Sequence, residues 1–420
     1  GRSRYPPGFP FPLGGARRLM KFLTGDLPGT GGRYKEQAED FLVEEIPLYP
    51  CSGTGEHSYL WIEKEGITTR ELLRQLSRGL NLKERDLGYA GLKDAKALTR
   101  QQISIPASHE GRLARLRLRQ SKILSTNRHD NKLRLGHLAG NRFSIRLRGT
   151  HDDALMRAEA IFKRLQADGV PNRFGEQRYG ILNNSHHLGR LLLQKNYPGF
   201  CSELIGDPQQ ITDPQWKRAA QAFRAGDLDL ALASLPRRMR EEQHLLQTLK
   251  NGQPEEQAVL NLPRALLRLL LSAYQSQLFD HLLEQRLPHL NQLETGDLAV
   301  KHVNGACFQV IDAAREQVRA DCFEISPSAP LFGHKVLLAE GVPGARERQL
   351  LEQEGLSLPE MKLGEGLSMP GERRPLRVPL GSARASATAD GLQLDFSLPK
   401  GSYATSVLSE LMKPAGDRSG

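Results

Sequence analysis

The pattern of hydrophobic and polar positions predicts short strands and amphipathic helices along this chain. Phe41 and Val43 alternate with other residues in DFLVEEIPLY, which is the spacing of a half-buried strand. HSYLWIEKEG predicts a second strand, and the polar, glycine-containing stretch SGTGE lies between the two. Two strands joined by such a connection are typical of a β-hairpin, and we expect one here.

A helix is predicted next, over GITTRELLRQLSRGL. Thr68 and Glu71 have the S/T-x-x-E spacing of a capping box, in which each side chain satisfies a backbone N–H at the helix start. The apolar positions recur at helical spacing and are Leu72, Leu73, Leu76 and Leu80.

Strands and helices continue to mix as far as about residue 195. Short strands are predicted at QQISIP and at NRFSIRLRG, where Phe143, Ile145 and Leu147 alternate with polar residues. DALMRAEAIFKRLQADGV predicts an amphipathic helix that ends at Gly169, because glycine is favoured just after a helix. No regular βαβ repeat is present, so this half of the chain is predicted to be α+β.

The region 196–377 has a different texture. It contains long helical patterns such as PRALLRLLLSAYQSQLFDHLLEQRL, then segments interrupted by glycine and proline, and it closes with GERRPLRVPLG. After it, GLQLDFSLPKG predicts a strand and SYATSVLSELMK a short helix. At the other end, residues 1–33 are rich in glycine and proline, which predicts an extended arm that wraps a body or stays mobile.

Composition narrows the class of protein. The chain has 420 residues, of which 39% are hydrophobic and 25% charged, so a wholly disordered chain is excluded. Its length predicts two to three domains of about 100–200 residues each. We find no apolar run of the roughly 18 residues that a membrane span needs, and no signal-peptide pattern. The four cysteines form no CxxC pair, so we expect neither disulfides nor zinc, and a reducing cytoplasm fits best.

The charge balance calls for an anionic partner. The formal net charge is +10, and nucleic acid is the first candidate partner for a basic chain, because neutralising phosphates releases counterions. A basic surface without a special partner is the alternative, and charge alone does not separate the two.

Several common catalytic motifs are absent. The chain has no GxxxxGK[ST], no GxGxxG that opens a helix after a strand, no HExxH and no GxSxG. His186 and His187 are adjacent rather than at the spacing of helical metal ligands, so they are interpreted as polar loop residues or RNA-facing ones. The sequence therefore does not favour nucleotide hydrolysis or zinc catalysis.

One polar cluster, GYAGLKDAKALTRQ, offers a candidate catalytic carboxylate. It places Asp94 between Lys93 and Lys96, with glycines on its N-terminal side. The ammonium groups would keep the carboxylate ionised, and the glycines would let a ligand approach. Asp94 could then act as a nucleophile or general base, or it could simply form an Asx-turn or cap a helix.

A second polar cluster, VPNRFGEQRYG, offers groups suited to a nucleobase. Asn172 can hydrogen-bond a base edge, Phe174 can stack on a base, and Arg178 can contact phosphate. A core aromatic residue with a turn asparagine explains the same residues equally well.

These blocks together resemble one known family. GYAGLKDAKALTRQ resembles the catalytic signature of the TruD family of pseudouridine synthases, the tRNA pseudouridine(13) synthases, with Asp94 at the aspartate of that motif. EDFLVEE resembles the family's N-terminal motif, with Lys35 upstream of Phe41. Further blocks follow in the family's order and are KLRLGHLAGNRF, VPNRFGEQRYG, SAYQSQLFDHLLEQR and LPKGSYATSVLSELM. Two positions depart from the pattern: Tyr403 where the family often has Phe, and Arg173 where it often has Tyr.

The resemblance implies a fold and a domain organisation. We expect an α+β pseudouridine synthase catalytic domain, built on a mixed, mainly antiparallel sheet, with a family-specific α+β domain inserted into it. The expected segments are the arm 1–33, the first part of the catalytic domain 34–195, the insert 196–377 and the last part of the catalytic domain 378–420. The cleft between the domains would hold RNA.

The resemblance also implies the chemistry. A uridine of tRNA would be isomerised to pseudouridine without metal or cofactor, after flipping out of its stack. Asp94 would be the nucleophile or base, and Lys35 the cation that pairs with it. Phe41, Asn172, Phe174 and Tyr403 are expected to hold the base. No membrane or protein partner is indicated, and we expect a monomer.

Two arginines of GERRPLRVP extend the expected RNA-binding set. Arg373 and Arg374 lie with Arg377 at the return into the catalytic domain, and a planar guanidinium suits phosphate. Salt bridges across the domain boundary are the alternative for these arginines. For the whole protein, the alternatives are a synthase of this family that acts on another RNA or position, and an inactive RNA-binding protein of this fold.

Overall fold

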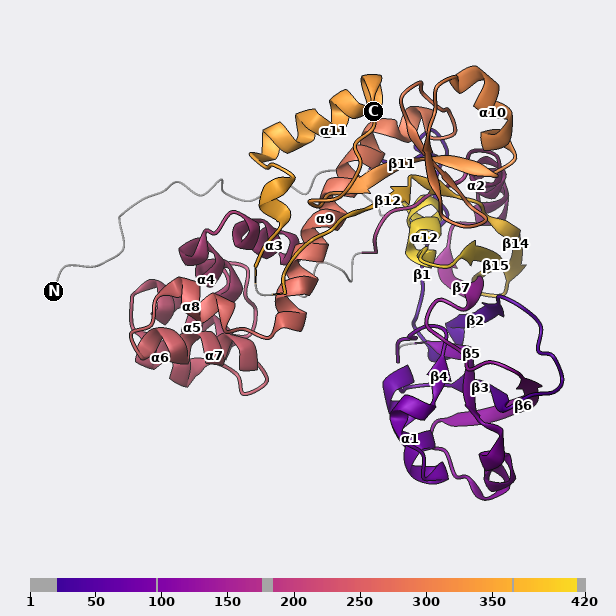
Figure 1. Ribbon diagram of the computed structural model, residues 1–420, viewed down its shortest axis with the longest axis horizontal. Helices are drawn as coiled ribbons and strands as arrows, with labels where there is room; N and C mark the ends of the chain where they lie inside the picture. Colours follow the sequence, from indigo (N-terminus) through magenta and orange to yellow (C-terminus); the bar gives the residue numbers. More distant parts are fainter. Residues whose placement is uncertain (1–20, 96, 176–183, 365, 414–420) are drawn as a thin grey trace.

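The computed structural model describes residues 21–95, 97–175, 184–364 and 366–413. Within them, a strand-rich part carries both ends of the described chain, and a helix-rich part is formed by the middle of the sequence (Figure 1). In Figure 1 the strand-rich part lies to the right, and the helices α3 to α8 lie to the left.

A mixed sheet of nine strands forms the centre of the strand-rich part. Its order is β14-β15-β7-β2-β5-β3-β6, with β1 also paired to β7 and β4 to β5. Only β2 and β5 run parallel among these pairs, so the predicted α+β fold with a mainly antiparallel sheet is confirmed. The strands are β1 (Gly31–Arg33), β2 (Phe41–Pro47), β3 (His57–Lys64), β4 (Gly88–Tyr89), β5 (Leu98–Pro106), β6 (Ser121–His129), β7 (Leu138–Thr150), β14 (Gly381–Thr388) and β15 (Gly391–Pro399).

The predicted hairpin of the first two long strands is wrong. Strand β5 lies between β2 and β3 and pairs with both of them. The connection between β2 and β3 instead runs along β6, where the N–H of Gly53 donates to the carbonyl of Arg128. A Cβ on Gly55 would meet the backbone of His129 at 2.5 Å, so this connection is held by packing against β6 rather than by a tight turn.

Two helices cover one face of the sheet around β7. The alternating residues Phe143, Ile145 and Leu147 are buried together with Leu394 and Phe396 of β15, as their spacing predicts. Helix α2 (Ala154–Asp168) and helix α12 (Ala404–Met412) complete this core. Helix α2 ends at Gly169, whose φ of +90° favours glycine.

Helix α1 (Thr69–Leu80) packs at the other end of the sheet. Its capping box is present, with both the Thr68 and the Glu71 side chains accepting from the backbone. All four leucines of the predicted stripe are at most 5% exposed and share a core with β3, β5 and the short 3-10 helix η3 (Ala107–Arg115).

The helix-rich part combines a helical core with a small sheet. Its sheet has the order β10-β9-β11-β12, and the 23-residue helix α9 packs against both β11 and the smaller helices. The helices are α3 (Ser185–Leu193), α4 (Tyr197–Ile205), α5 (Pro214–Arg224), α6 (Leu228–Ser234), α7 (Arg240–Lys250), α8 (Glu255–Leu260), α9 (Arg264–Arg286), α10 (Ala313–Asp321) and α11 (Gly341–Glu354). The strands are β9 (Leu298–Lys301), β10 (Cys307–Gln309), β11 (Ile325–Leu331) and β12 (Glu372–Pro375).

The chain passes between the two parts at one paired crossing. Strand β8 (Val170–Pro171) leads out of the strand-rich part, and it pairs antiparallel with β13 (Arg377–Val378), which leads back. Helix α3, which we expected in the catalytic domain, lies in the core of the helix-rich part and packs against α9. The helix-rich part therefore begins before residue 185.

The N-terminal segment that the structure describes is bound to the last helix. Glu410 is buried and accepts hydrogen bonds from the backbone N–H of Leu23 and of Thr24, each at 3.0 Å. The N–H of Thr30 donates to the carbonyl of Leu411. Residues 21–33 of the expected arm therefore pack on the protein, while residues 1–20 lie outside the described residues.

Candidate active site

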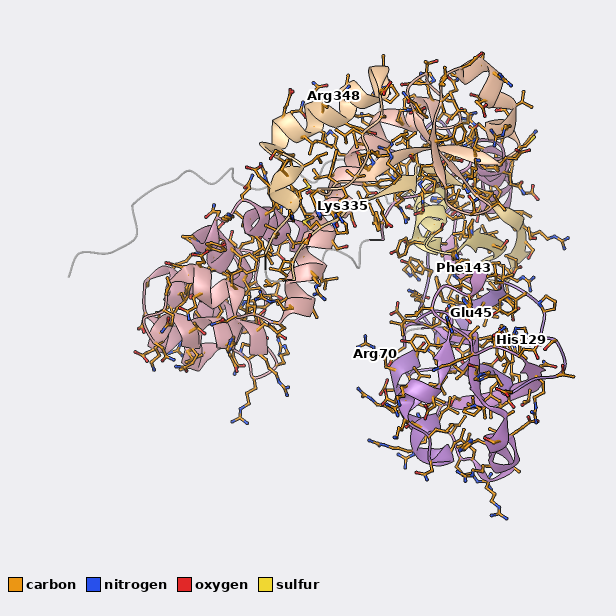
Figure 2. The ribbon with its side chains drawn as sticks, viewed as in Figure 1. Glu45, Arg70, His129, Phe143, Lys335 and Arg348 are labelled. Carbon is orange, nitrogen blue, oxygen red and sulfur yellow. The ribbon has the colours of Figure 1, made fainter. Side chains whose placement is uncertain are left out.

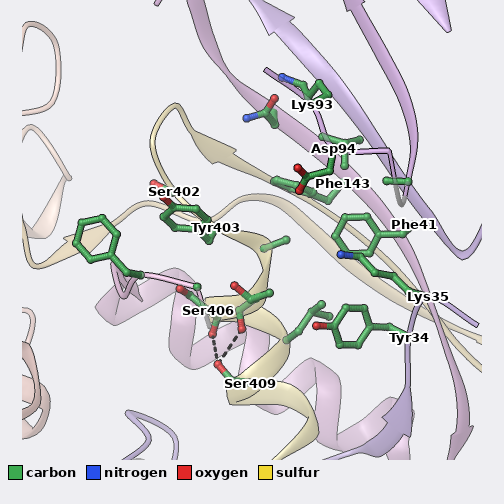
Figure 3. A pocket seen from close by; sticks show the side chains of 18 of the residues that line it. Tyr34, Lys35, Phe41, Lys93, Asp94, Phe143, Ser402, Tyr403, Ser406 and Ser409 are labelled. Carbon is green, nitrogen blue, oxygen red and sulfur yellow. Dashed lines mark hydrogen bonds between the residues drawn. The ribbon is translucent and has the colours of Figure 1, made fainter. Parts of the chain in front are cut away.

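Four segments that are far apart in sequence line one cavity of about 670 Å³. This volume is in the range of pockets that bury a small organic ligand. The lining residues lie within 34–43, 92–99, 173–175 and 402–412, with further contributions from β7 and α9. Figure 3 shows Asp94 pointing into this cavity, with Lys35 and Phe41 on one side and Tyr403 on the other.

Asp94 lies in the loop between β4 and β5, and its side chain is exposed. It therefore caps no helix, since a strand follows it. The loop is tied to the first residue of α1, because the N–H of Lys93 donates to Oγ1 of Thr69 at 2.8 Å. The N–H of Thr69 donates back to the carbonyl of Lys93.

A buried lysine supports the same loop from behind. Lys64, at the end of β3, is 1% exposed, and its ammonium donates to the carbonyls of Asp94 at 2.9 Å and Ile67 at 2.7 Å. A longer bond of 3.4 Å reaches the carbonyl of Lys93. Burial lowers the pKa of Lys64 to about 8, although the nearby Asp94 opposes this shift.

Lys93 forms a buried ion pair with Glu45. Its ammonium lies 2.8 Å from Oε1 of Glu45, and both side chains are less than a tenth exposed. The other carboxylate oxygen of Glu45 accepts from the N–H of Gln102. Burial raises the pKa of Glu45, and the Lys93 ammonium partly offsets that rise. Lys93 therefore anchors the loop to β2, and both Lys93 and Lys35 line the cavity.

Lys35 is held over an aromatic ring at the cavity wall. Its Nζ lies 4.3 Å from the ring centroid of Phe41 and 5.6 Å from that of Tyr34. A cation over a ring face is attracted by the ring quadrupole. Lys35 also has a φ of +63°, which is uncommon for a residue with a side chain and costs free energy of the order of 1 kcal/mol. The fold holds this strained lysine in the wall of the cavity.

Tyr403 and Phe174 form an aromatic wall opposite Lys35. Their ring centroids are 6.1 Å apart, and Tyr403 is 36% exposed while Phe174 is 9% exposed. The guanidinium of Arg374 stacks on Phe174 at 4.3 Å from the ring centroid. Tyr403 therefore presents the more accessible ring to a ligand, and Arg374 fixes the ring behind it.

Asn172 lies behind this aromatic wall rather than in the cavity lining. It is 3% exposed, its amide donates to the carbonyl of Pro375 at 2.9 Å, and its Oδ1 accepts from Arg374 at 2.6 Å. In this structure its side chain positions Arg374.

The two arginines expected to bind RNA use their donors inside the protein. Arg373 is paired with Glu347 at 2.8 Å, both side chains being 5% exposed, and it also donates to the carbonyl of Ser328. Arg374 donates to the carbonyls of Asn172 and Gly401. This is the arrangement of the alternative interpretation, an internal network at the domain boundary. Arg178, the third candidate, lies outside the described residues.

Sequence reasoning missed Lys64 and Glu45 as parts of the site. Both residues lie within predicted strands, and nothing in the strand patterns marked them as functional. Charged residues are almost never fully buried unless paired, but burial itself is visible only in the fold.

In the part of the chain that the structure describes, no helix has the length and apolar composition of a membrane span, and no group of three or more His, Cys, Asp and Glu residues is arranged to hold a metal.

Comparison with known proteins agrees with this architecture. A family model described as tRNA pseudouridine synthase D (TruD) matches residues 19–411. A protein of Syntrophotalea carbinolica named tRNA pseudouridine synthase D is 54% identical over 94% of this chain and 99% of its own, and one of Geobacter metallireducens with the same name is 53% identical over 94% and 98%. A crystal structure of a TruD protein from Methanosarcina mazei superposes with a TM-score of 0.81 at 27% identity, covering 94% of this chain and 96% of that one.

The fold is that of a pseudouridine synthase. Within that class the chain belongs to the TruD family, because the match covers nearly its whole length at more than half identity to some members. The expectation drawn from the ordered sequence blocks is thereby confirmed.

Proposed function

We propose that this protein isomerises uridine 13 of tRNA to pseudouridine, with Asp94 as the catalytic nucleophile or base. The observation that carries the proposal is the position of Asp94. Its carboxylate is exposed in a cavity walled by aromatic rings and a lysine, and two lysines hold its loop in place. Family membership supports the class of reaction, and the names of the relatives support tRNA as the substrate.

The reaction asks for little beyond a carboxylate and a shaped cavity. The bond from C1′ to N1 breaks, the uracil turns, and C1′ is joined to C5. C5 then gives up its proton and N1 gains one, so atoms balance without an oxidant or a cofactor. A carboxylate can attack C1′ or remove a proton from the sugar, and both roles require it to be ionised and within reach.

The proposal gives roles to residues in the cavity wall and behind it. Lys35 supplies a positive charge to the cavity that Asp94 also lines. Tyr403 and Phe41 enclose the flipped base, since an aromatic ring offers a stacking face to any base. Phe174 and Asn172 act from behind, through Tyr403 and Arg374.

Other parts of the proposal concern the setting of the enzyme. We propose that it works as a monomer on tRNA in the cytoplasm, without a metal or a cofactor. The wide spacing of the four cysteines, which form no CxxC pair, is the ground for proposing a reducing compartment.

Mapping pseudouridine in tRNA tests this function. Purified protein should convert uridine 13 of an unmodified tRNA transcript, and tRNA from cells that lack the protein should lose pseudouridine at that position. Conversion at another position, or of another RNA only, would favour the alternative substrate. Tight tRNA binding without any conversion would favour an inactive RNA-binding protein.

A further inference from the structure

Half of the net charge of this protein is concentrated beside the loop that carries Asp94. Helix α1 and the segment 107–120, which follows β5, carry seven arginines against two acids, Glu71 and Glu110, which leaves +5 of the total +10 in 26 residues. All seven arginines are exposed. We call them the α1 basic surface: Arg70, Arg74, Arg78, Arg112, Arg115, Arg117 and Arg119.

The arginines of α1 form one row. Arg70, Arg74 and Arg78 recur every four residues, so they lie about 6 Å apart along the outer face of the helix. Figure 2 shows Arg70 at the surface of this helix. The opposite face carries the buried leucines, which holds the row toward solvent.

The second set of arginines runs alongside the helix. The N–H of Arg119 donates to Oε1 of Gln75 at 2.8 Å, and the guanidinium of Arg112 donates to the carbonyl of Leu80 at 2.9 Å. Leu116 and Leu118 pack into the core between these points. The alternating arginines therefore face outward, and the two sets make one continuous surface.

This positive charge is not neutralised within the described residues. None of the seven arginines forms an ion pair with a described carboxylate. The two acids are engaged elsewhere: Glu71 accepts from Thr68 at the helix cap, and Glu110 pairs with Arg128. An exposed, unneutralised row of guanidinium groups is suited to phosphates, which it can bind in a bidentate manner.

We propose that the α1 basic surface binds the phosphate backbone of tRNA beyond the flipped uridine. The proposal rests on the proposed function. The α1 basic surface is continuous with the cavity, because Thr69, the first residue of α1, is hydrogen-bonded to Lys93, next to Asp94. RNA that delivers a uridine to the cavity must continue away from it, and α1 leads from the cavity edge along the row. Backbone contacts of this kind fix the register of the RNA without reading its sequence.

The test compares two triple variants with equal charge loss. Arg74→Gln/Arg78→Gln/Arg117→Gln removes charge from the α1 basic surface, and Arg218→Gln/Arg237→Gln/Arg240→Gln removes it from exposed sites of the α5–α7 region. In the first variant we expect the Kd for a tRNA transcript to rise at least about tenfold near 0.1 M salt, and the slope of log affinity against log salt to fall by about two to three. The second variant should match the wild type.

Further outcomes separate this inference from the proposed function. A tRNA in which the target uridine is replaced by cytidine should show the same loss of affinity, because the contacts are to backbone. An unchanged salt slope in the first variant, or an equal loss in the second, would overturn the inference. Absence of pseudouridine formation by the wild type would overturn the proposed function whatever the slopes.

A different observation carries a second inference, also resting on the proposed function. We infer that Lys64 is a positioning residue for Asp94. Its ammonium is buried behind the loop and bonds the backbone carbonyl of Asp94 itself, together with those of Ile67 and Lys93. A buried ammonium that joins these carbonyls fixes the path of the loop, and a carboxylate displaced by even a fraction of an ångström reacts more slowly.

The protonation of Lys64 gives this role a signature. The charged groups that act on it are Asp94 and Glu71, which favour its ammonium, and Lys93, which opposes it. Because its pKa is lowered to about 8, the ammonium is lost as pH rises through 8. In the unfolded chain, the lysine would keep its proton up to about pH 10. Between pH 8 and about pH 10, the contribution of Lys64 to the free energy of unfolding therefore increases with pH. Deprotonation of Lys64 above pH 8 should therefore lower the reaction rate without lowering the stability of the fold.

Lys64→Met and Lys64→Arg test the second inference. Lys64→Met should lower the single-turnover rate on saturating tRNA at least about tenfold while the Kd for tRNA changes less than about threefold. The wild-type rate should fall above pH 8, and Lys64→Arg, which stays charged there, should move this fall to higher pH. A Lys64→Met rate within twofold of wild type, or the same alkaline fall in Lys64→Arg, would overturn it.

Discussion

At the return from the helix-rich part, the guanidinium groups of Arg373 and Arg377 are buried and bond to groups of the protein. On the α1 basic surface, seven arginines reach solvent and none pairs with a described carboxylate. The two regions have similar arginine content in sequence but opposite environments. Burial therefore distinguishes the two sets of arginines: those at the return hold the protein together, and those of the α1 basic surface are available to phosphate.

Arg377→Met should have the largest effect on stability. Arg377 is fully buried and donates to the carbonyls of Asp168 and Ala320, at the ends of α2 and α10. Burial lowers its pKa to about 10, so its charge is held at neutral pH. We expect the variant to lose about 3 kcal/mol of unfolding free energy in urea, since two charge-assisted bonds are removed. Arg384→Met, at an exposed site of β14, should lose little.

Arg373→Gln should have the next largest effect and should depend on pH. It leaves Glu347 buried without its partner, at a cost of about 2 kcal/mol near neutral pH. Burial already raises the pKa of Glu347, and loss of Arg373 raises it further. A carboxyl group whose pKa is raised by folding adds stability at low pH. That stability is lost as pH rises above the ordinary pKa of glutamate, so the defect should be larger at pH 8 than at pH 5.

The double variant Arg373→Gln/Glu347→Gln sharpens that prediction. It removes the unpaired carboxylate and should recover part of the lost stability in urea titrations at pH 8. An altered salt slope for tRNA binding in Arg373→Gln would instead show that this arginine contacts RNA. It would contradict the contrast between the buried arginines at the return and the α1 basic surface.

Arg374→Gln should have a smaller effect on stability and a visible effect on rate. The guanidinium stacks on Phe174 and bonds Asn172, so about 1 kcal/mol of unfolding free energy should be lost. Phe174 supports Tyr403 at the cavity, and the single-turnover rate should fall several-fold while tRNA affinity changes little. A rate equal to that of wild type would separate this network from the active site.

Metal removal should have no effect. We expect turnover of pre-folded tRNA to be unchanged after dialysis against EDTA, because the proposed chemistry uses only a carboxylate and positioned side chains. Loss of turnover that one divalent ion restores, with the tRNA shown to remain folded, would contradict this expectation.

Local patterns in the sequence predicted the elements well where the structure depends on near neighbours. The capping box of α1, its buried leucines, and the alternating residues of β7 all depend on contacts within a few residues. The pairing of strands does not. The hairpin prediction failed because β5, which is more than thirty residues further along the chain than the end of β3, inserts between β2 and β3.

The candidate site was predictable in part for the same reason. The ordered blocks identified Asp94, Lys35 and Tyr403, and all three line the cavity. The loop supports Lys64 and Glu45 come from separate strands, and their roles exist only once the sheet is formed. Asn172 appeared suited to a base in sequence, yet both ends of its amide are bonded within the protein.

The most direct test of the central claim compares Asp94→Asn with Asp152→Asn, a matched change at an exposed aspartate after β7. The first keeps the shape of the side chain and removes its charge in the cavity. We predict that it abolishes pseudouridine formation in a single-turnover assay and leaves the Kd for tRNA within a few-fold of wild type, while Asp152→Asn is fully active. Formation of pseudouridine by Asp94→Asn at a rate near that of wild type would contradict the account.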